Sequence, residues 1–305
     1  MPDQADLLRE RMDRTHAAPL LRMRHGHART VVVASGKGGV GKSQLAVNLG
    51  VALALSDHPV CVLDAHTGLG SVDLLCGLNG YWNLAHVAAG GRRLADVCLA
   101  GPGGVRILTG ASALVEPAGA PPIRAEAIRE LETLAAECDY LIVDTSPGPS
   151  SVNRRFCDAA DLVLVVTTPE PTALAAAYAT CRSLAAGGPR LAPGSGPVAP
   201  PAALVVNRTT SEQQGADIAE RVRRTVRQFV NGKLAAAGSI PDDDAVLEAS
   251  FRRQPFVIAA PQAPAAAGVR ALAAWLVDHL ETVRSGGPAS FFARLLEAGA
   301  DAKAA

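Results

Sequence analysis

The chain has 305 residues, of which 49% are hydrophobic and 19% are charged, and its formal net charge is zero. This composition is that of a globular protein with a substantial core, and it excludes a fibrous or disordered chain. Electroneutrality also argues against a protein whose main role is to coat nucleic acid, although it leaves room for a local basic patch.

The cysteines and the N-terminus indicate the cellular compartment. The six cysteines are scattered and form no C-x-x-C pair, which is typical of free thiols in a reducing compartment. The N-terminus is charged and has no apolar stretch of signal-peptide length. No run of about 18 apolar residues is present to span a bilayer. We therefore expect a cytoplasmic protein.

Short apolar runs alternate with longer helical patterns from residue 30 onward. The expected strands are 30–35, 59–64, 105–108, 139–144, 161–167 and 202–207, and the expected helices include 42–55, 125–136, 171–186 and 212–230. Several strands are continuously apolar, as is usual when both faces of a sheet are covered. The pattern predicts an α/β fold with a doubly wound, mostly parallel sheet. We expect this core over 30–284, after an N-terminal segment (1–29) and before a C-terminal helix and tail (285–305).

The first expected strand leads directly into the sequence GKGGVGKS at residues 36–43, and a helical pattern follows it. This matches the phosphate-binding P-loop pattern G-x-x-x-x-G-K-[ST] in its strand–loop–helix context, which argues against a glycine-rich turn without function. Backbone N–H groups of such a loop surround phosphates, Lys42 neutralises them and the Ser43 hydroxyl binds Mg²⁺. We predict ATP or ADP with Mg²⁺, bound by Gly36, Lys37, Gly38, Gly39, Val40, Gly41, Lys42, Ser43 and Gln44.

A carboxylate near Mg²⁺ is expected from the apolar strand that ends at Asp144. Ligands bind at the carboxyl edge of such sheets, so Asp144 is predicted to join Ser43 as a metal residue. An apolar strand that ends in aspartate is also common for structural reasons, and the P-loop is what makes the metal role the favoured one. Gly148, four residues later, is expected to offer a backbone N–H to the γ-phosphate.

The additional lysine makes the loop similar to one known family. The run KGGVGKS at residues 37–43 resembles the deviant phosphate loop of the ParA/MinD ATPases. The resemblance extends over about residues 30–282 and includes 63–78, 166–173 and 205–208. It implies that Lys37 crosses the interface of an ATP-bound homodimer to reach the partner's nucleotide, much as an arginine finger does. It also implies that Asn207 and Arg208 contact the adenine. A solvated lysine is the alternative for Lys37.

Three segments resemble the flagellar group of that family, FlhG (also called FleN). These are residues 240–246, residues 252–256 and the sequence DQADLLR at residues 3–9. The resemblance implies that the N-terminal helix activates a GTPase of the FlhF type, with Gln4 orienting the attacking water. Flagellar switch-complex proteins or a transcription regulator are further implied partners. A frayed N-terminal tail is the alternative. The predicted partner-binding residues are Asp3, Gln4, Ala5, Leu8 and Arg9.

One position departs from the family pattern. The family usually carries Asp-x-Asp after the second strand, whereas this chain has Asp64-Ala65-His66. Histidine can act as a base, but it is bulkier and offers no second carboxylate next to Mg²⁺. We therefore expect a slow ATPase that binds nucleotide well. The predicted catalytic residues are Lys37, Lys42, Asp64 and His66.

A short C-terminal helical pattern follows the core. It places Phe291, Phe292, Leu295 and Leu296 on one face. Members of the family dock such a helix on membranes, which implies reversible binding to the inner face of the cell membrane. One helix binds marginally, and two helices tethered in a dimer bind better. The alternative is a helix packed on the protein's own surface.

The resemblance implies a dimerising ATPase that regulates the number or placement of flagella. Two other classes of protein compete with this hypothesis. A ParA-like partition ATPase binds DNA as an ATP dimer and needs a basic stripe with steeply salt-dependent affinity. Because the net charge is zero, no nucleic-acid partner is expected. An iron–sulfur carrier needs paired cysteines, and Cys98 and Cys138 lack the necessary sequence context.

Overall fold

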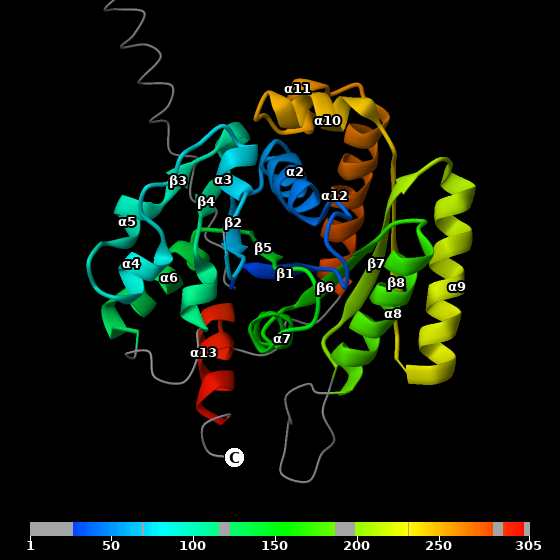
Figure 1. The fold of residues 1–305 in the computed structure, drawn as a ribbon. Helices are drawn as coiled ribbons and strands as arrows, with labels where there is room; N and C mark the ends of the chain where they lie inside the picture. Colours follow the sequence, from blue (N-terminus) through cyan, green and yellow to red (C-terminus); the bar gives the residue numbers. More distant parts are fainter. Residues whose placement is uncertain are drawn as a thin grey trace, which may run out of the picture.

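The computed structural model describes residues 27–68, 70–115, 123–186, 199–230, 232–282 and 289–301. One sheet has the strand order β3-β4-β2-β5-β1-β6-β7-β8, and helices cover both of its faces (Figure 1). Neighbouring strands are parallel except for the antiparallel pair β3 and β4. The predicted doubly wound, mostly parallel sheet is confirmed.

The strands are β1 (Arg29–Ala34), β2 (Val60–Ala65), β3 (Leu99–Ala100), β4 (Arg106–Leu108), β5 (Tyr140–Thr145), β6 (Leu162–Thr167), β7 (Ala202–Thr209) and β8 (Ala235–Pro241). The α-helices are α2 (Lys42–Ala54), α3 (Val72–Leu75), α4 (Leu84–Ala88), α5 (Leu94–Val97), α6 (Ala125–Ala136), α7 (Ser151–Asp158), α8 (Pro171–Ala186), α9 (Glu212–Val230), α10 (Asp244–Phe251), α11 (Phe256–Ala259), α12 (Pro264–Thr282) and α13 (Phe291–Asp301). Two short 3-10 helices, η1 (Pro102–Gly104) and η2 (Ala111–Leu114), flank β4.

The central strand β1 divides the core into two layers. Val31 and Val33 point into a cluster with α2 and α12, whereas Val32 and Ala34 point into a cluster with α6, α7, α8, α9 and α13. All four side chains are buried, which explains why this strand shows no alternation of apolar and polar residues. The P-loop follows β1 and therefore lies at the middle of the carboxyl edge of the sheet.

The edge strand β8 was not predicted. Its sequence AAAGSIP contains one β-branched residue, Ile240, and so lacks the composition typical of a strand. It forms because β7 offers a parallel partner and because α9 and α12 pack against it.

The apolar face of the C-terminal helix α13 is packed against the core in this structure. The side chains of Phe291, Phe292 and Leu295 are at most 1% exposed, and only Leu296 is partly exposed. They join the core cluster that contains Phe156, and the helix packs against α6 and α7. The structure thus shows the alternative of a docked helix, which the burial of these side chains in the core stabilises. Membrane binding by this helix stays a prediction.

The predicted partner-binding residues Asp3, Gln4, Ala5, Leu8 and Arg9 lie outside the described residues. Within the described part of the chain, none of the helices has the length and hydropathy needed to cross a membrane.

Candidate nucleotide-binding site

The P-loop has a conformation that its glycines make possible. Gly39 and Gly41 have φ angles of +79° and +85°, in the left-handed region that side chains rarely adopt. Gly41 is the N-cap of α2, so the helix begins at Lys42 with its free N–H groups at the loop. A Cβ atom at Gly36 would lie 2.3 Å from the carbonyl oxygen of Ala176 on α8. The helix N-terminus and the exposed loop backbone together form an anion-binding cradle.

A buried ion pair lies at the base of this cradle. The Nζ atom of Lys42 is 2.6 Å from Oδ1 of Asp144, and the two side chains are 6% and 0% exposed. Burial raises the pKa of Asp144, while Lys42, His66 and the hydroxyl of Ser43 act in the opposite direction. Oδ2 of Asp144 is buried and has no hydrogen-bond partner among the described residues. The side chains of Lys42, Ser43 and Asp144 therefore meet at one point, as predicted.

Asp64 is held by the turn that follows β2. It accepts hydrogen bonds from the backbone N–H groups of Ser71 and Val72 at 3.0 and 3.2 Å, at the start of α3. Gly70 is needed here, because a Cβ atom at this position would lie 2.1 Å from the Asp64 carboxylate. Burial raises the pKa of Asp64, but hydrogen bonds from His66 and Val72 outweigh it and the net pKa is lowered. Asp64 is therefore ionised at neutral pH.

His66 lies between the two carboxylates and the lysine. Its Nδ1 atom is 2.9 Å from Oδ1 of Asp64 and 3.5 Å from Oδ2 of Asp144. Since Asp64 is ionised and can only accept, Nδ1 carries the hydrogen in this arrangement. Nε2 then presents a lone pair to Nζ of Lys42, 3.4 Å away. The structure thus brings three of the four predicted catalytic residues together.

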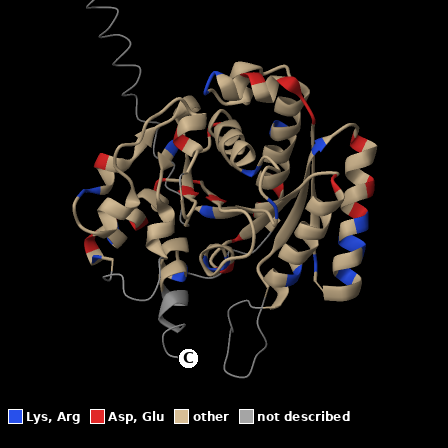
Figure 2. Ribbon diagram, in the orientation of Figure 1, with Lys and Arg blue, Asp and Glu red and all other residues tan. Residues whose placement is uncertain are grey.

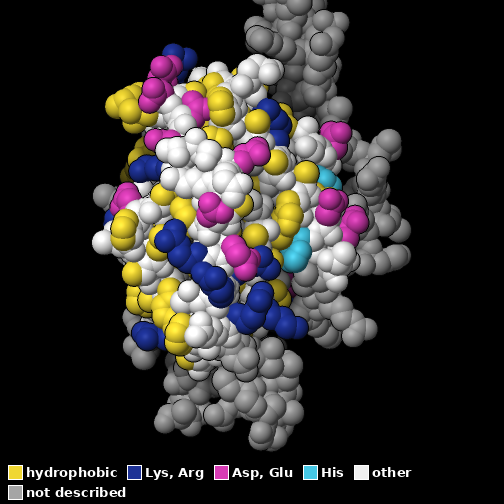
Figure 3. All heavy atoms as spheres, turned by 90° about the vertical axis from the view of Figure 1, so that its right-hand side faces the viewer, with side chains coloured by type: hydrophobic (Ala, Val, Ile, Leu, Met, Phe, Trp, Pro, Cys, Tyr) yellow, Lys and Arg dark blue, Asp and Glu magenta, His cyan; other side chains and the backbone are white. Residues whose placement is uncertain are grey.

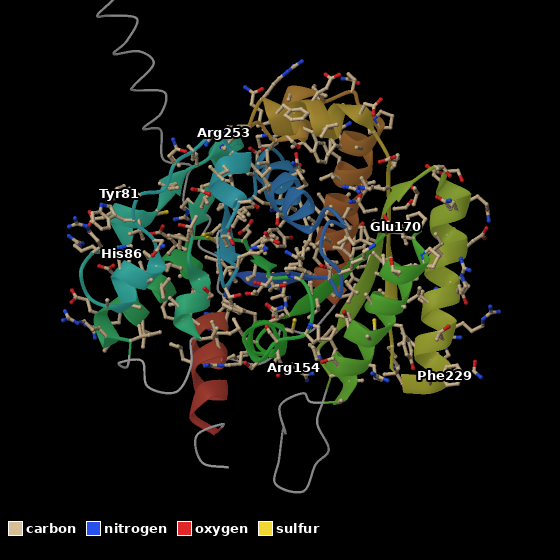
Figure 4. The ribbon with its side chains drawn as sticks, viewed as in Figure 1. Tyr81, His86, Arg154, Glu170, Phe229 and Arg253 are labelled. Carbon is tan, nitrogen blue, oxygen red and sulfur yellow. The ribbon has the colours of Figure 1, made fainter. Side chains whose placement is uncertain are left out.

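The fourth, Lys37, points away from the cradle. Its Nζ atom lies 2.5 Å from Glu170 and 2.9 Å from the Thr172 hydroxyl. Glu170, labelled in Figure 4, lies on the connection between β6 and α8. The Lys37 ammonium lowers the pKa of the exposed Glu170 carboxyl. A role of Lys37 in the partner's site stays a prediction, because here the lysine is paired within its own chain.

The expected nucleotide contacts on other segments have mixed outcomes. The N–H of Gly148 donates to the carbonyl of Ser35 at 2.8 Å. The expectation of a free N–H for the γ-phosphate is therefore corrected, because that N–H fixes the loop after β5. Asn207 donates to the carbonyl of Val40 at 2.8 Å and so supports the P-loop. Arg208 is exposed and has φ of +57°. A pocket beside the P-loop is lined by residues that include Gln44, Asn207, Arg208, Pro241 and Asp242.

The residues of the cradle fit a phosphate ligand with a divalent cation. The cradle offers N–H groups and Lys42 for phosphate, and it offers Ser43 and the unpaired oxygen of Asp144 for a cation. Among the described residues, Asp64, His66 and Asp144 form the group close enough to share a metal ion, and this group contains no cysteine. The described cysteines therefore give no support to an iron–sulfur site.

Several residues with a clear role escaped the sequence analysis. Glu170 and Thr172 hold Lys37, and Gly70 makes room for Asp64. Ser112 donates to the carbonyl of His66 at 3.0 Å, and the backbone N–H of Thr67 donates to Ser146 at 3.0 Å. Glu170 and Thr172 lie in residues 166–173, which resemble the ParA/MinD family, and this resemblance could have marked them as candidate site residues. The others depend on contacts between distant parts of the chain.

Comparison with known proteins agrees with this geometry. The ParA family model, described as NUBPL iron-transfer P-loop NTPase, matches residues 26–186. Antiactivator FleN of Pseudomonas aeruginosa is 34% identical over 246 residues, which cover 80% of this chain and 84% of FleN. Flagellum site-determining protein YlxH of Helicobacter pylori is 27% identical over 280 residues, covering 89% and 91%.

The fold matches solved structures as well. The septum site-determining protein MinD of Pyrococcus horikoshii, complexed with Mg-ADP, superposes with a TM-score of 0.64. The match covers 85% of this chain and 100% of MinD at 20% identity. The sheet, the P-loop and the sequence similarity lead to one conclusion: the chain belongs to the ParA/MinD family of P-loop ATPases and is similar to its flagellar members.

Proposed function

We propose that the chain is an ATP-dependent dimerising switch that controls the number or placement of flagella. The observation that carries the proposal is the additional lysine of the P-loop, Lys37, which is solvent-exposed and lies beside the phosphate cradle of Lys42 and Asp144. FleN is named an antiactivator and YlxH a flagellum site-determining protein. The proposal transfers the flagellar role of these relatives to this chain.

Binding of nucleotide requires Lys42 to change its partner. The cradle N–H groups and Lys42 bind the phosphates, while Ser43 and Asp144 hold Mg²⁺, which neutralises phosphate charge when bound. Lys42 now neutralises Asp144. When Lys42 turns to the phosphates, Asp144 becomes available to the cation. The buried pair thus keeps the site preformed until nucleotide arrives.

Dimerisation requires Lys37 to leave Glu170. Both side chains are substantially exposed, at 40% and 56%, and exposed ion pairs contribute little to stability because solvent screens them. A partner's polyphosphate carries more charge than one carboxylate, so it competes effectively for Lys37. An exposed pair of this kind therefore suits a lysine that acts in a second subunit.

Hydrolysis is proposed to be slow because of His66. An imidazole held by Asp64 stands where relatives carry a second carboxylate. His66→Asp is expected to raise the rate of ATP hydrolysis, and Lys42→Ala defines the background rate. An unchanged or lower rate in His66→Asp would remove His66 as the cause of slow turnover.

The N-terminal residues are proposed to bind an FlhF-type GTPase, with flagellar switch-complex proteins or a transcription regulator as further partners. The test is a pull-down with the full chain and Gln4→Ala, followed by measurement of GTP hydrolysis. Gln213→Ala on the exposed side of α9 is the matched control. We expect Gln4→Ala alone to lose GTPase activation. If neither the GTPase nor a flagellar switch protein is recovered by the wild type, the flagellar role fails even where ATP binding holds.

Membrane binding through α13 is proposed to need undocking of the helix. Arg294 is 3.1 Å from Asp161, and Arg155 donates to the Leu295 carbonyl at 3.0 Å, so polar contacts as well as apolar ones hold the helix. Sedimentation with liposomes, with and without ATP, compares the full chain with a truncation at Ser285. Equal sedimentation of both proteins would refute the anchor.

DNA binding is a second candidate function, favoured by the charge distribution on α9. The first half of this helix carries acidic residues and the second half carries arginines (Figure 2). Figure 3 faces this side and shows Lys and Arg gathered in its lower part. Arg221, Arg224 and Arg227 are exposed, and the labelled Phe229 projects from the helix end in Figure 4. This local stripe is compatible with zero net charge.

The two candidate functions predict different salt dependence. A phosphate-binding stripe loses DNA affinity steeply as salt rises, and it weakens further when Arg224 becomes Glu. Arg252→Glu, at the exposed residue that follows α10, is the matched control. Fluorescence anisotropy with a random duplex tests this. We expect no specific loss in Arg224→Glu, and a loss confined to that variant would favour the DNA-binding function.

A further inference from the structure

Two parallel strands end side by side at the P-loop and bring three ligand-type side chains together. β2 and β5 pair Asp64 directly with Asp144, and His66 follows β2 by one residue. The strand register therefore fixes both carboxylates at the same height on the carboxyl edge. His66 then turns its ring across the gap between them.

The donor atoms have the spacing of metal ligands. His66 Nδ1 is 2.9 Å from Asp64 Oδ1 and 3.5 Å from Asp144 Oδ2, and all three ligand atoms lie within 4.8 Å of one another. Around a divalent cation with bonds of about 2.1 Å, neighbouring ligand atoms are roughly 3.0–3.4 Å apart. The three atoms could thus occupy one face of a coordination sphere with little movement.

One of these atoms lacks a partner. Asp144 is 0% exposed, and its Oδ2 atom accepts no hydrogen bond from the described residues. Buried carboxylate oxygens are normally satisfied, because leaving one unpaired costs free energy. It lies 3.5 Å from Nδ1 of His66, so this oxygen is free to bind a cation shared with Asp64 and His66.

We propose that His66 is a direct nitrogen ligand of the divalent cation in the nucleotide site, with Asp64 and Asp144, and that it shifts the preference of the site toward transition metals. The inference rests on the proposed function, because the cation accompanies the nucleotide. Imidazole suits cations such as Co²⁺, Fe²⁺ and Zn²⁺, whereas Mg²⁺ requires oxygen ligands. On coordination the ring hydrogen moves from Nδ1 to Nε2, which Lys42 leaves when it turns to the phosphates, so the neutral imidazole offers its Nδ1 lone pair to the cation.

Cation binding at these atoms is coupled to nucleotide binding. The Lys42 ammonium lies 2.6 Å from Asp144 and 3.4 Å from Nε2 of His66, so in this position its charge repels a cation from the three ligand atoms. Phosphates attract Lys42 and remove this repulsion. The three ligands therefore bind a cation tightly only together with ADP or ATP.

The test uses the full chain with ADP and two metals as probes. Pulsed EPR of Mn²⁺ detects a directly bound ¹⁴N nucleus, and equilibrium dialysis with labelled ADP measures how Co²⁺ and Mg²⁺ support nucleotide binding. The variants are His66→Asp, which keeps an oxygen ligand, and His279→Gln, which changes a histidine on α12. Far-UV circular dichroism verifies that each variant is folded.

We expect ¹⁴N modulation in the wild type and in His279→Gln, and none in His66→Asp. The ratio of ADP affinity with Co²⁺ to that with Mg²⁺ is expected to fall at least about tenfold in His66→Asp. Wild-type protein that binds ADP without ¹⁴N modulation would overturn the inference and leave the proposed function intact. Protein that binds no ADP with any metal would overturn both, and the dialysis reports that outcome separately.

Discussion

Asp144→Asn separates the contribution of the buried ion pair from that of the nucleotide. The substitution keeps the side-chain volume and removes the charge that faces Lys42 at 2.6 Å. The lysine is 6% exposed, so it cannot recover full hydration. Breaking a buried pair typically costs about 3–5 kcal/mol, because one charge is left without compensation. The amide oxygen still accepts a hydrogen bond, so we expect the lower end, about 3 kcal/mol.

Urea unfolding in the absence of nucleotide measures this loss. Glu220→Gln is the control, because Glu220 pairs with Arg223 on the surface of α9 with side chains 58% and 34% exposed, where a pair contributes at most about 1 kcal/mol. A loss below about 1 kcal/mol in Asp144→Asn, equal to the control, would refute the reasoning.

ATP is expected to restore part of the stability of Asp144→Asn. Phosphate oxygens give Lys42 a new partner, so the variant gains more from ATP than the wild type does. At 100 times its dissociation constant, a ligand stabilises the native state by about 2.7 kcal/mol. The experiment is done with EDTA, so that only the phosphates act. An equal or smaller gain in the variant would show that Lys42 does not reach the phosphates.

Three further predictions concern α13, Lys37 and the thiols. Phe292→Ala, which truncates a fully buried ring, is expected to destabilise the docked helix by about 3–5 kcal/mol and to speed hydrogen exchange in α13. Leu296→Ala, at a partly exposed side chain, should destabilise the helix less. Unchanged exchange in Phe292→Ala would contradict the docking. Glu170→Gln frees Lys37 and is expected to tighten the ATP-bound dimer slightly, because an exposed ion pair competes only weakly with the partner's nucleotide. A weaker dimer in sedimentation velocity would show that Glu170 assists dimerisation. Burial raises the pKa of all six thiols, so they ionise less readily in the native state than in the unfolded chain, where thiols ionise near pH 9. Stability should therefore fall from pH 9 upward by up to about 1.4 kcal/mol per pH unit for each thiol that stays protonated. Constant stability between pH 8.5 and 10.5 would contradict their burial. Burial raises the pKa to about 12 for Cys76, Cys157 and Cys181 and to about 11 for Cys138, and it also raises the pKa of Cys61 and Cys98.

Local chemistry explains which features the sequence could predict. The P-loop was predictable because its glycines, lysine and serine are contiguous and each has its own physical role. The core strands were predictable because burial on both faces leaves continuous apolar runs. β8 was not, since an alanine-rich segment becomes a strand only through its neighbours β7, α9 and α12.

Contacts between residues far apart in the sequence explain the features that could not be predicted. The apolar face of α13 was visible in the sequence, but whether it meets lipid or the core depends on the space between α6 and α7. The contact between Lys37 and Glu170 joins residues 133 positions apart. The N–H of Gly148 donates to Ser35, a carbonyl that no local pattern identifies. Each of these depends on how the sheet orders its strands.

The mass of the protein in solution with and without a non-hydrolysable ATP analogue tests the central claim most directly. Size-exclusion chromatography with light scattering compares wild type, Lys37→Ala and the control Lys233→Ala, an exposed lysine before β8. We predict that the analogue converts wild type and Lys233→Ala to dimers, while Lys37→Ala binds the analogue and stays monomeric. A wild type that binds the analogue as a monomer, or a Lys37→Ala variant that dimerises equally well, would contradict the account.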